Sequence, residues 1–124
     1  MSVQVSVLEN GMRVVTESML RVETVSCGVW VGSGARNEPA EVSGVAHLLE
    51  HMAFKGTERR SAQDIVEEIE SVGGHLNAYT SREQTAYYAK VLRENTELAL
   101  DLLADILQHS IFDEEELERE RAVV

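Results

Sequence analysis

Alternating apolar and polar residues at the start of the chain predict β-structure. Valines alternate with polar residues over positions 3–7, Asn10-Gly11 is a tight-turn dipeptide, and extended patterning returns over 12–16, which together predict a β-hairpin. Residues 22–31 are rich in β-branched side chains and end at Gly32-Ser33-Gly34. This run predicts a strand in the centre of a sheet.

Apolar residues at helical spacing then predict two helices. Pro39 marks a loop, after which Ser43 is expected to cap the first helix. Ser61 and Asp64 open a second helix, and Gly73-Gly74 closes it. The side chains expected to face the core on this second helix are Ala62, Ile65, Val66, Ile69 and Val72.

A second hairpin and two further helices follow. Residues 76–80 and 85–92 have the composition of paired strands. Asn95 is expected to cap a third helix and Asp113 a fourth, which has an acidic first turn and is still running at Val124. The third helix repeats Leu98, Ala99, Leu102, Leu103, Ile106 and Leu107 at helical spacing. The element order implies an α+β fold, a mostly antiparallel sheet with helices packed on one face.

The amino-acid composition and net charge limit the kinds of molecule that the protein is expected to bind. A chain of 124 residues with 44% hydrophobic residues fits a single compact domain. The 22 acidic and 11 basic residues give a formal charge of −11, which disfavours nucleic acid and favours a cationic partner. No apolar run is long enough to span a membrane and no leader pattern stands at the start. We therefore expect a cytoplasmic protein of a bacterium, or else a protein from which a mitochondrial transit segment has already been removed. Cys27 is the only cysteine, so no internal disulfide is expected.

One segment carries recognisable chemistry, His47-Leu48-Leu49-Glu50-His51. Residues four apart lie on one face of a helix, so His47 and His51 can bind one cation while Glu50 reaches its bound water. Imidazole nitrogens are ligands for zinc, and a carboxylate can accept a proton from the bound water so that hydroxide attacks a peptide carbonyl. The pattern therefore indicates a metallopeptidase with Glu50 as the general base.

Other segments extend this pattern over nearly the whole chain: Gly32–Glu38, Gly44–Thr57, Gly73-Gly74, Asn77–Thr80 and Glu118–Arg121. Together with the motif they resemble the inverted-motif zinc peptidases of the M16 or pitrilysin type, and within them the branch similar to the processing-peptidase β subunit. The resemblance implies that His47 and His51 are zinc ligands and that Glu50 is the general base. It places a third ligand, a glutamate, at about position 127, beyond Val124.

The last predicted helix adds a carboxylate to this site. Leu117 and Glu120 lie on one stripe that continues through Val124 to about position 127, so Glu120 is expected to point inward. By the resemblance, Glu120 supports the metal site from outside the ligand shell. Residues 1–124 would then be the N-terminal part of the catalytic domain, ending inside a helix before the third ligand.

The resemblance also implies how a substrate binds. In the family, the strand that matches residues 76–80 pairs with an extended peptide through main-chain hydrogen bonds, which makes Asn77 and Ala78 candidate substrate-binding residues. Phe54, three residues after His51, would line the pocket for the substrate residue that follows the cleaved peptide bond.

The leading hypothesis is a zinc metalloendopeptidase that cuts extended, basic peptides. The resemblance implies that activity needs a second homologous half, on the same chain or on a partner subunit, and that the full-length protein forms a dimer, so residues 1–124 alone are expected to be inactive. A non-catalytic scaffold or partner subunit is the alternative, and the intact motif argues against it. A lyase acting on S-ribosylhomocysteine shares the motif but needs a later cysteine ligand, and no cysteine follows Cys27.

Overall fold

The computed structural model describes residues 2–123. The chain begins with a hairpin of β1 (Val3–Val7) and β2 (Arg13–Glu17), paired antiparallel in a two-stranded sheet of their own. The turn at Asn10-Gly11 places Gly11 at φ 88°, a left-handed conformation that glycine adopts without strain. The hairpin predicted from the valine alternation is therefore confirmed, and all its strand residues are exposed.

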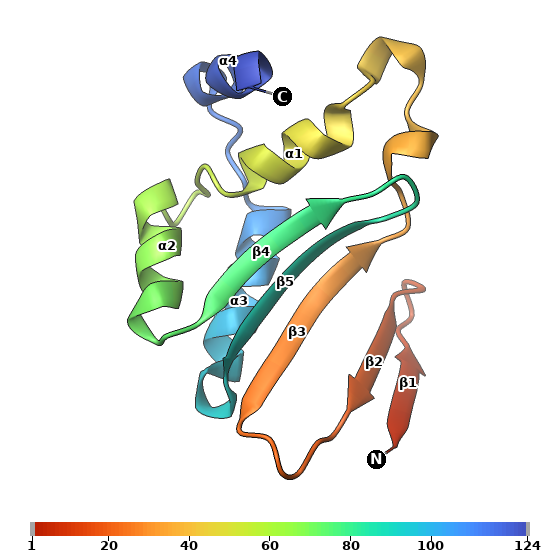
Figure 1. Ribbon diagram of the computed structural model, residues 1–124, viewed down its shortest axis with the longest axis vertical. Helices are drawn as coiled ribbons and strands as arrows, with labels where there is room; N and C mark the ends of the chain where they lie inside the picture. Colours follow the sequence, from red (N-terminus) through yellow and green to blue (C-terminus); the bar gives the residue numbers. More distant parts are fainter. Residues whose placement is uncertain (1, 124) are drawn as a thin grey trace.

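The main sheet has three antiparallel strands, β3 (Thr24–Val31), β4 (His75–Thr80) and β5 (Thr85–Leu92), in the order β3-β5-β4 (Figure 1). Within residues 2–123, β3 lies at one edge and β5 is the strand paired on both sides, so the prediction of a central strand at 22–31 is wrong. β-Branched composition marks a strand but does not distinguish an edge from a centre. Among the described residues, β4 forms the opposite edge.

In the part of the chain that the structure describes, four helices complete the fold: α1 (Val45–Ala53), α2 (Ala62–Ser71), α3 (Thr96–Gln108) and α4 (Glu114–Val123). α1 and α2 contact β4, α3 contacts β3 and β5, and α4 packs against α1 beyond the end of the sheet (Figure 1). Short 3-10 turns at 35–37, 40–42 and 93–95 connect these elements. Within residues 2–123, no helix has the length and apolar character to cross a membrane.

One hydrophobic core lies between the helices and one face of the three-stranded sheet. β5 contributes Tyr87, Ala89 and Val91 to it, and Tyr88 and Lys90 point to the exposed face, as the two-residue period of a strand requires. The helical side of the core consists of Ala53, Ile65, Ile69, Ala99, Leu102, Leu103 and Ile106. The α+β class with helices on one face is therefore confirmed.

α2 follows the predicted boundaries closely. Ser61 and Asp64 form a capping box, in which the Ser61 hydroxyl accepts from the Asp64 amide and the Asp64 carboxylate accepts from the Ser61 amide. Ile65 and Ile69 are buried as expected, but Val66 is 49% exposed. Val66 lies about 100° around the helix from Ile65, which turns it out of the narrow contact that α2 makes with the sheet.

The caps of the last two helices differ from each other. Asn95 stands at the N-cap of α3, but its side chain makes no capping hydrogen bond. Its backbone, at φ −105° and ψ 16°, continues the preceding 3-10 turn and lacks the extended conformation that a capping side chain needs. Asp113 does cap α4, because its carboxylate accepts from the Glu116 amide at 3.2 Å.

Candidate active site

The N-terminus of the helix that carries the His-x-x-Glu-His motif is capped by a side chain that lies outside the helix. Gly44, at φ 89°, occupies the N-cap of α1, so Ser43 lies outside the helix and the prediction that it caps is wrong. The Glu38 carboxylate takes this role, accepting from the Ala46 amide at 2.6 Å and the Gly44 amide at 2.9 Å. These backbone bonds, that of Ala46 first, lower the pKa of Glu38.

α1 brings the two histidine rings together on its surface. His47 Nε2 and His51 Nε2 lie 3.0 Å apart, and the rings meet edge to face with centroids separated by 4.6 Å. Two imidazole nitrogens bound to one tetrahedral zinc at about 2.0–2.1 Å would lie roughly 3.3 Å apart, close to this separation. The donor types and the spacing of the two nitrogens therefore fit a shared zinc ion.

Glu120 of α4 stands behind the second histidine. Its carboxylate is buried, and Oε2 lies 2.8 Å from His51 Nδ1. A carboxylate on the far nitrogen of a histidine leaves Nε2 free for a metal and fixes the orientation of the ring. The Lys55 ammonium lies 3.0 Å from the other oxygen, Oε1. The hydrogen bond from Lys55, joined by that from His51, holds the pKa of Glu120 below its ordinary value.

Glu50 faces the end of β4. Its Oε2 accepts a hydrogen bond from the Thr80 hydroxyl at 2.6 Å, which leaves Oε1 free of any other hydrogen bond within residues 2–123. Tyr87 is buried nearby, and burial together with the charge of Glu50 raises the pKa of its phenol. Thr80 was not among the residues expected at the site, because strand patterning gives no sign that its hydroxyl points at α1.

The predicted substrate-binding residues are only partly brought together. Phe54 and Asn77 line the same cavity of about 260 Å³, which lies between α2 and the start of β4. Ala78 is 9% exposed and its side chain belongs to the hydrophobic core. Its backbone amide donates to the Asn77 side-chain oxygen at 2.8 Å. Pairing of a substrate with the main chain of Asn77 and Ala78 stays a prediction.

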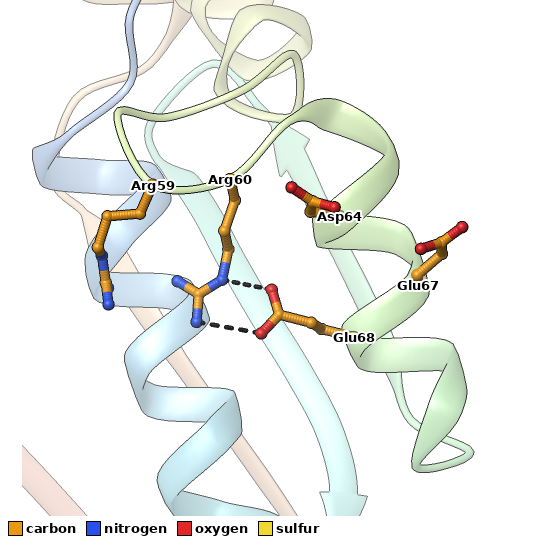
Figure 2. A pocket seen from close by; sticks show the side chains of 5 residues that line it. All are labelled: Arg59, Arg60, Asp64, Glu67 and Glu68. Atoms are coloured by element: carbon orange, nitrogen blue, oxygen red, sulfur yellow. Dashed lines mark hydrogen bonds and ion pairs between the residues drawn. The ribbon is translucent and has the colours of Figure 1, made fainter.

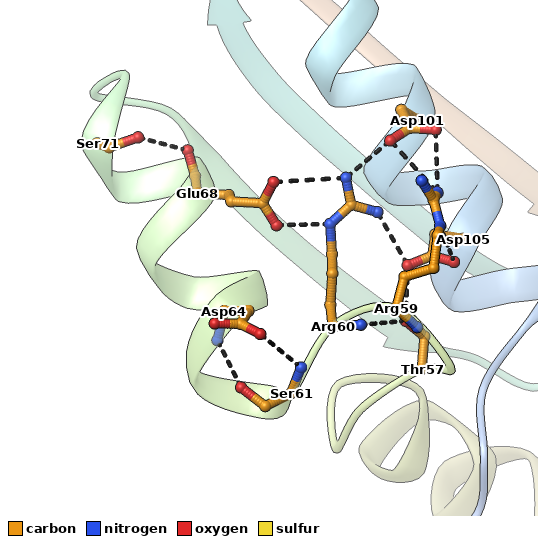
Figure 3. A network of polar contacts seen from close by, with 9 residues as sticks. All are labelled: Thr57, Arg59, Arg60, Ser61, Asp64, Glu68, Ser71, Asp101 and Asp105. Atoms are coloured by element: carbon orange, nitrogen blue, oxygen red, sulfur yellow. Dashed lines mark hydrogen bonds and ion pairs between the residues drawn. The ribbon is translucent and has the colours of Figure 1, made fainter.

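A second cavity, of about 390 Å³, lies away from the motif (Figure 2). Its lining is wholly charged and consists of Arg59, Arg60, Asp64, Glu67 and Glu68. Arg60 donates from Nε to Glu68 at 2.5 Å, and its guanidinium also reaches Asp101 and Asp105 of α3 (Figure 3). These contacts tie the loop after α1 to α2 and α3, which indicates a structural role.

Within residues 2–123, no three His, Cys, Asp or Glu side chains are placed to hold a metal ion. The described part of the chain thus offers two histidine side chains that could hold a metal, His47 and His51, and Glu120 contacts the second of them. The third ligand expected at about position 127 lies outside the described residues.

An α+β domain whose helix carries His-x-x-Glu-His, with a carboxylate behind the second histidine, has the features of an inverted-motif peptidase domain. The chain belongs to the Insulinase family (Peptidase family M16), whose family model matches residues 13–124.

The chain is similar to proteins of plants and bacteria. It is 59% identical over 121 residues to the probable mitochondrial-processing peptidase subunit beta of Arabidopsis thaliana, covering 98% of this chain and 23% of that protein. It is 52% identical over 116 residues to the uncharacterized zinc protease YmxG of Bacillus subtilis strain 168, covering 94% and 28%.

The same architecture occurs in a solved structure. The crystal structure of a protease from Helicobacter pylori superimposes with a TM-score of 0.92 at 32% identity, covering 98% of this chain and 30% of that one. The chain thus spans about a quarter of the length of the curated relatives named above.

Proposed function

We propose that the protein containing this chain is a zinc-dependent metalloendopeptidase, with His47 and His51 as zinc ligands and Glu50 as the general base. The observation that carries the proposal is the convergence of His47 Nε2 and His51 Nε2 at 3.0 Å, with Glu120 on the far nitrogen of His51. Membership of Peptidase family M16 and the similarity to a protein named a zinc protease support it.

Zinc held by the two histidines and one further ligand would supply a water of lowered pKa and would polarise the scissile carbonyl. The residues of the chain have separate tasks around that chemistry. Glu50 accepts the proton of the attacking water at its carboxylate, and Thr80 fixes one carboxylate oxygen so that the other faces the reaction. Glu120 orients the His51 ring.

We infer that the substrate is an extended peptide bound along β4. This strand lies at the edge of the sheet in the described part of the chain, and its end reaches Glu50 through Thr80. Phe54 and Asn77 line the cavity beside this edge. This cavity would receive the side chain of the substrate residue that follows the cleaved bond. The charge of −11 favours basic peptides, because opposite charge raises the rate of encounter.

The remaining parts of the proposal concern the whole protein. Residues 1–124 would be the N-terminal part of its catalytic domain, inactive alone and completed by a second homologous half. The name of the Arabidopsis relative supports a subunit arrangement, since that protein is called the probable mitochondrial-processing peptidase subunit beta. A dimer in the cytoplasm of a bacterium is the form that we propose.

Metal removal tests the proposal. The full-length protein is assayed with an internally quenched basic peptide before and after dialysis against a chelator, then after adding back zinc or magnesium. Cleavage is expected to disappear with the zinc and to return with zinc alone, because magnesium prefers oxygen ligands. Cleavage that persists in protein shown to be free of zinc would contradict the proposal.

A further inference from the structure

We propose that Lys55 is a positioning residue for the metal site, holding Glu120 so that it supports His51. This inference rests on the zinc site proposed above. Lys55 Nζ lies 3.0 Å from Glu120 Oε1, and Glu120 Oε2 lies 2.8 Å from His51 Nδ1. The three groups form a chain in which each carboxylate oxygen has its own partner.

Glu120 needs both partners because of where it lies. The side chain is only 11% exposed, so an oxygen without a partner would lose its hydration and gain no hydrogen bond in return. His51 occupies one oxygen. Within residues 2–123, Lys55 is the only lysine or arginine that forms an ion pair with Glu120, so it holds the second oxygen and with it the rotation of the carboxylate.

The position of Lys55 links two helices. It follows the C-cap of α1 at Phe54, where a cation is favoured by the helix macrodipole, and its amide donates to the Met52 carbonyl at 3.1 Å. From there its ammonium reaches α4, where Glu116 Oε2 lies 3.9 Å away in addition to Glu120. Lys55 therefore fixes the distance between the helix that carries the histidines and the helix that carries their support.

The arginines of α4 do not duplicate this contact. Arg119 pairs with the exposed Glu115 and the partly buried Glu116, and Arg121 pairs with the exposed Glu118, all at positions three or four residues away on the same helix. Such surface pairs contribute little and leave the buried carboxylate untouched. Loss of the Lys55 ammonium should therefore leave Glu120 Oε1 without a cation.

The test is the zinc affinity of the full-length protein, measured in the apoprotein by competition with a chromophoric chelator. Lys55→Met removes the cation and keeps most of the aliphatic stem, and it should weaken zinc binding about tenfold, the lower end of the effect of outer partners on metal affinity. Lys55→Arg should bind zinc nearly as the wild type does. Lys90→Met changes the only other lysine of the chain, an exposed one on β5, and serves as the matched control.

A double-mutant cycle shows whether Lys55 acts through Glu120. Glu120→Gln should weaken zinc binding by about 10- to 100-fold. Lys55→Met should add no further loss in that background, because the carboxylate on which Lys55 acts is gone. Thermal unfolding of each apoprotein checks that the variants fold, and Lys55→Gln replaces Lys55→Met if the latter does not.

The outcomes separate this inference from the proposed function. Wild-type affinity in Lys55→Met, or an equal loss with and without Glu120, would overturn the role of Lys55 while leaving the zinc site intact. A wild-type protein that binds no zinc would contradict the proposed function itself.

Discussion

At the scale of residues, two of the three motif side chains, Glu50 and His51, have a partner from a distant segment. Glu50 on α1 is held by Thr80 of β4, and His51 is held by Glu120 of α4. His47 has its neighbour His51 as its contact. The motif therefore depends on two elements packed against its helix, and their side chains determine which atoms remain available for metal and water.

Thr80→Val tests how Glu50, the proposed general base, is held in position. The substitution keeps the β-branched shape that the strand prefers and removes the hydroxyl that donates to Glu50 Oε2. We expect kcat/KM to fall about 10- to 100-fold, since one hydrogen bond to a charged group contributes roughly 1.5–3 kcal/mol, and we expect zinc affinity to stay unchanged. Thr16→Val in the N-terminal hairpin is the control. Unchanged kcat/KM in Thr80→Val would show that Glu50 is positioned without Thr80.

At the scale of elements, the start of α1 and the junction of α2 with α3 are fixed by charged groups. Glu38 supplies acceptors to the first amides of α1, where the left-handed Gly44 has no side chain to offer. Asp105 is fully buried in α3 and receives hydrogen bonds from Thr57 and Arg60 (Figure 3). Both contacts involve a loop that borders α1, so they position the motif helix from its two ends.

Glu38→Ala should loosen the start of α1. The amides of Gly44 and Ala46 lose their acceptors, so their hydrogen exchange should become faster while that of α3 does not change. Glu41→Ala, at an exposed glutamate three residues later, is the matched control and should leave these amides protected. Equal exchange in the two variants would show that the Glu38 contacts do not stabilise the helix.

Arg60→Met should destabilise the packing of α2 on α3. It leaves the buried Asp105 without its closest cation, and breaking a buried ion pair costs about 3–5 kcal/mol. Native-state hydrogen exchange of the α2 and α3 amides measures this loss. Arg36→Met is the control, because Arg36 and its partner Glu83 are 64% and 76% exposed and their pair should contribute under about 1 kcal/mol. Similar losses in both variants would refute the assignment.

The same pair predicts a pH dependence. Burial raises the pKa of Asp105, but hydrogen bonds from Thr57 and Arg60 outweigh burial and leave it below its ordinary value. The stabilisation is therefore fully present above the unfolded pKa of about 3.9 and is lost as pH falls through the lower folded pKa. Without Arg60 the loss should begin at higher pH, which acid titration of the exchange rates can show.

At the scale of the whole molecule, the sequence predicts the layers better than the contacts between them. Periodicity placed the strands and helices, and the inward stripe of α4 indicated the burial of Glu120. Thr80, Glu38 and Lys55 were missed, because each acts on a residue of another element and pairwise contact leaves no local pattern. The edge position of β3 was missed for the same reason, since strand order is a property of the sheet.

The net charge of −11 on residues 1–124 leads to a prediction about how the full-length protein binds its substrate. If acidity attracts basic peptides, raising the ionic strength from about 0.05 to 0.5 M should raise KM for a basic peptide several-fold, because screening shortens the range of attraction. A matched peptide with glutamine in place of each lysine should show no such dependence. Equal salt dependence for the two peptides would exclude charge as a source of preference.

The measurement that tests the central claim most directly is peptide cleavage by full-length Glu50→Gln, with its zinc content determined in the same sample. The account predicts that cleavage falls by about 10²–10⁴-fold while zinc stays bound, because the base is lost and the ligands remain. Glu97→Gln, at an exposed glutamate of α3, should cleave as the wild type does. Wild-type cleavage by zinc-loaded Glu50→Gln would contradict the assignment of Glu50 as the general base and, with it, the proposed mechanism.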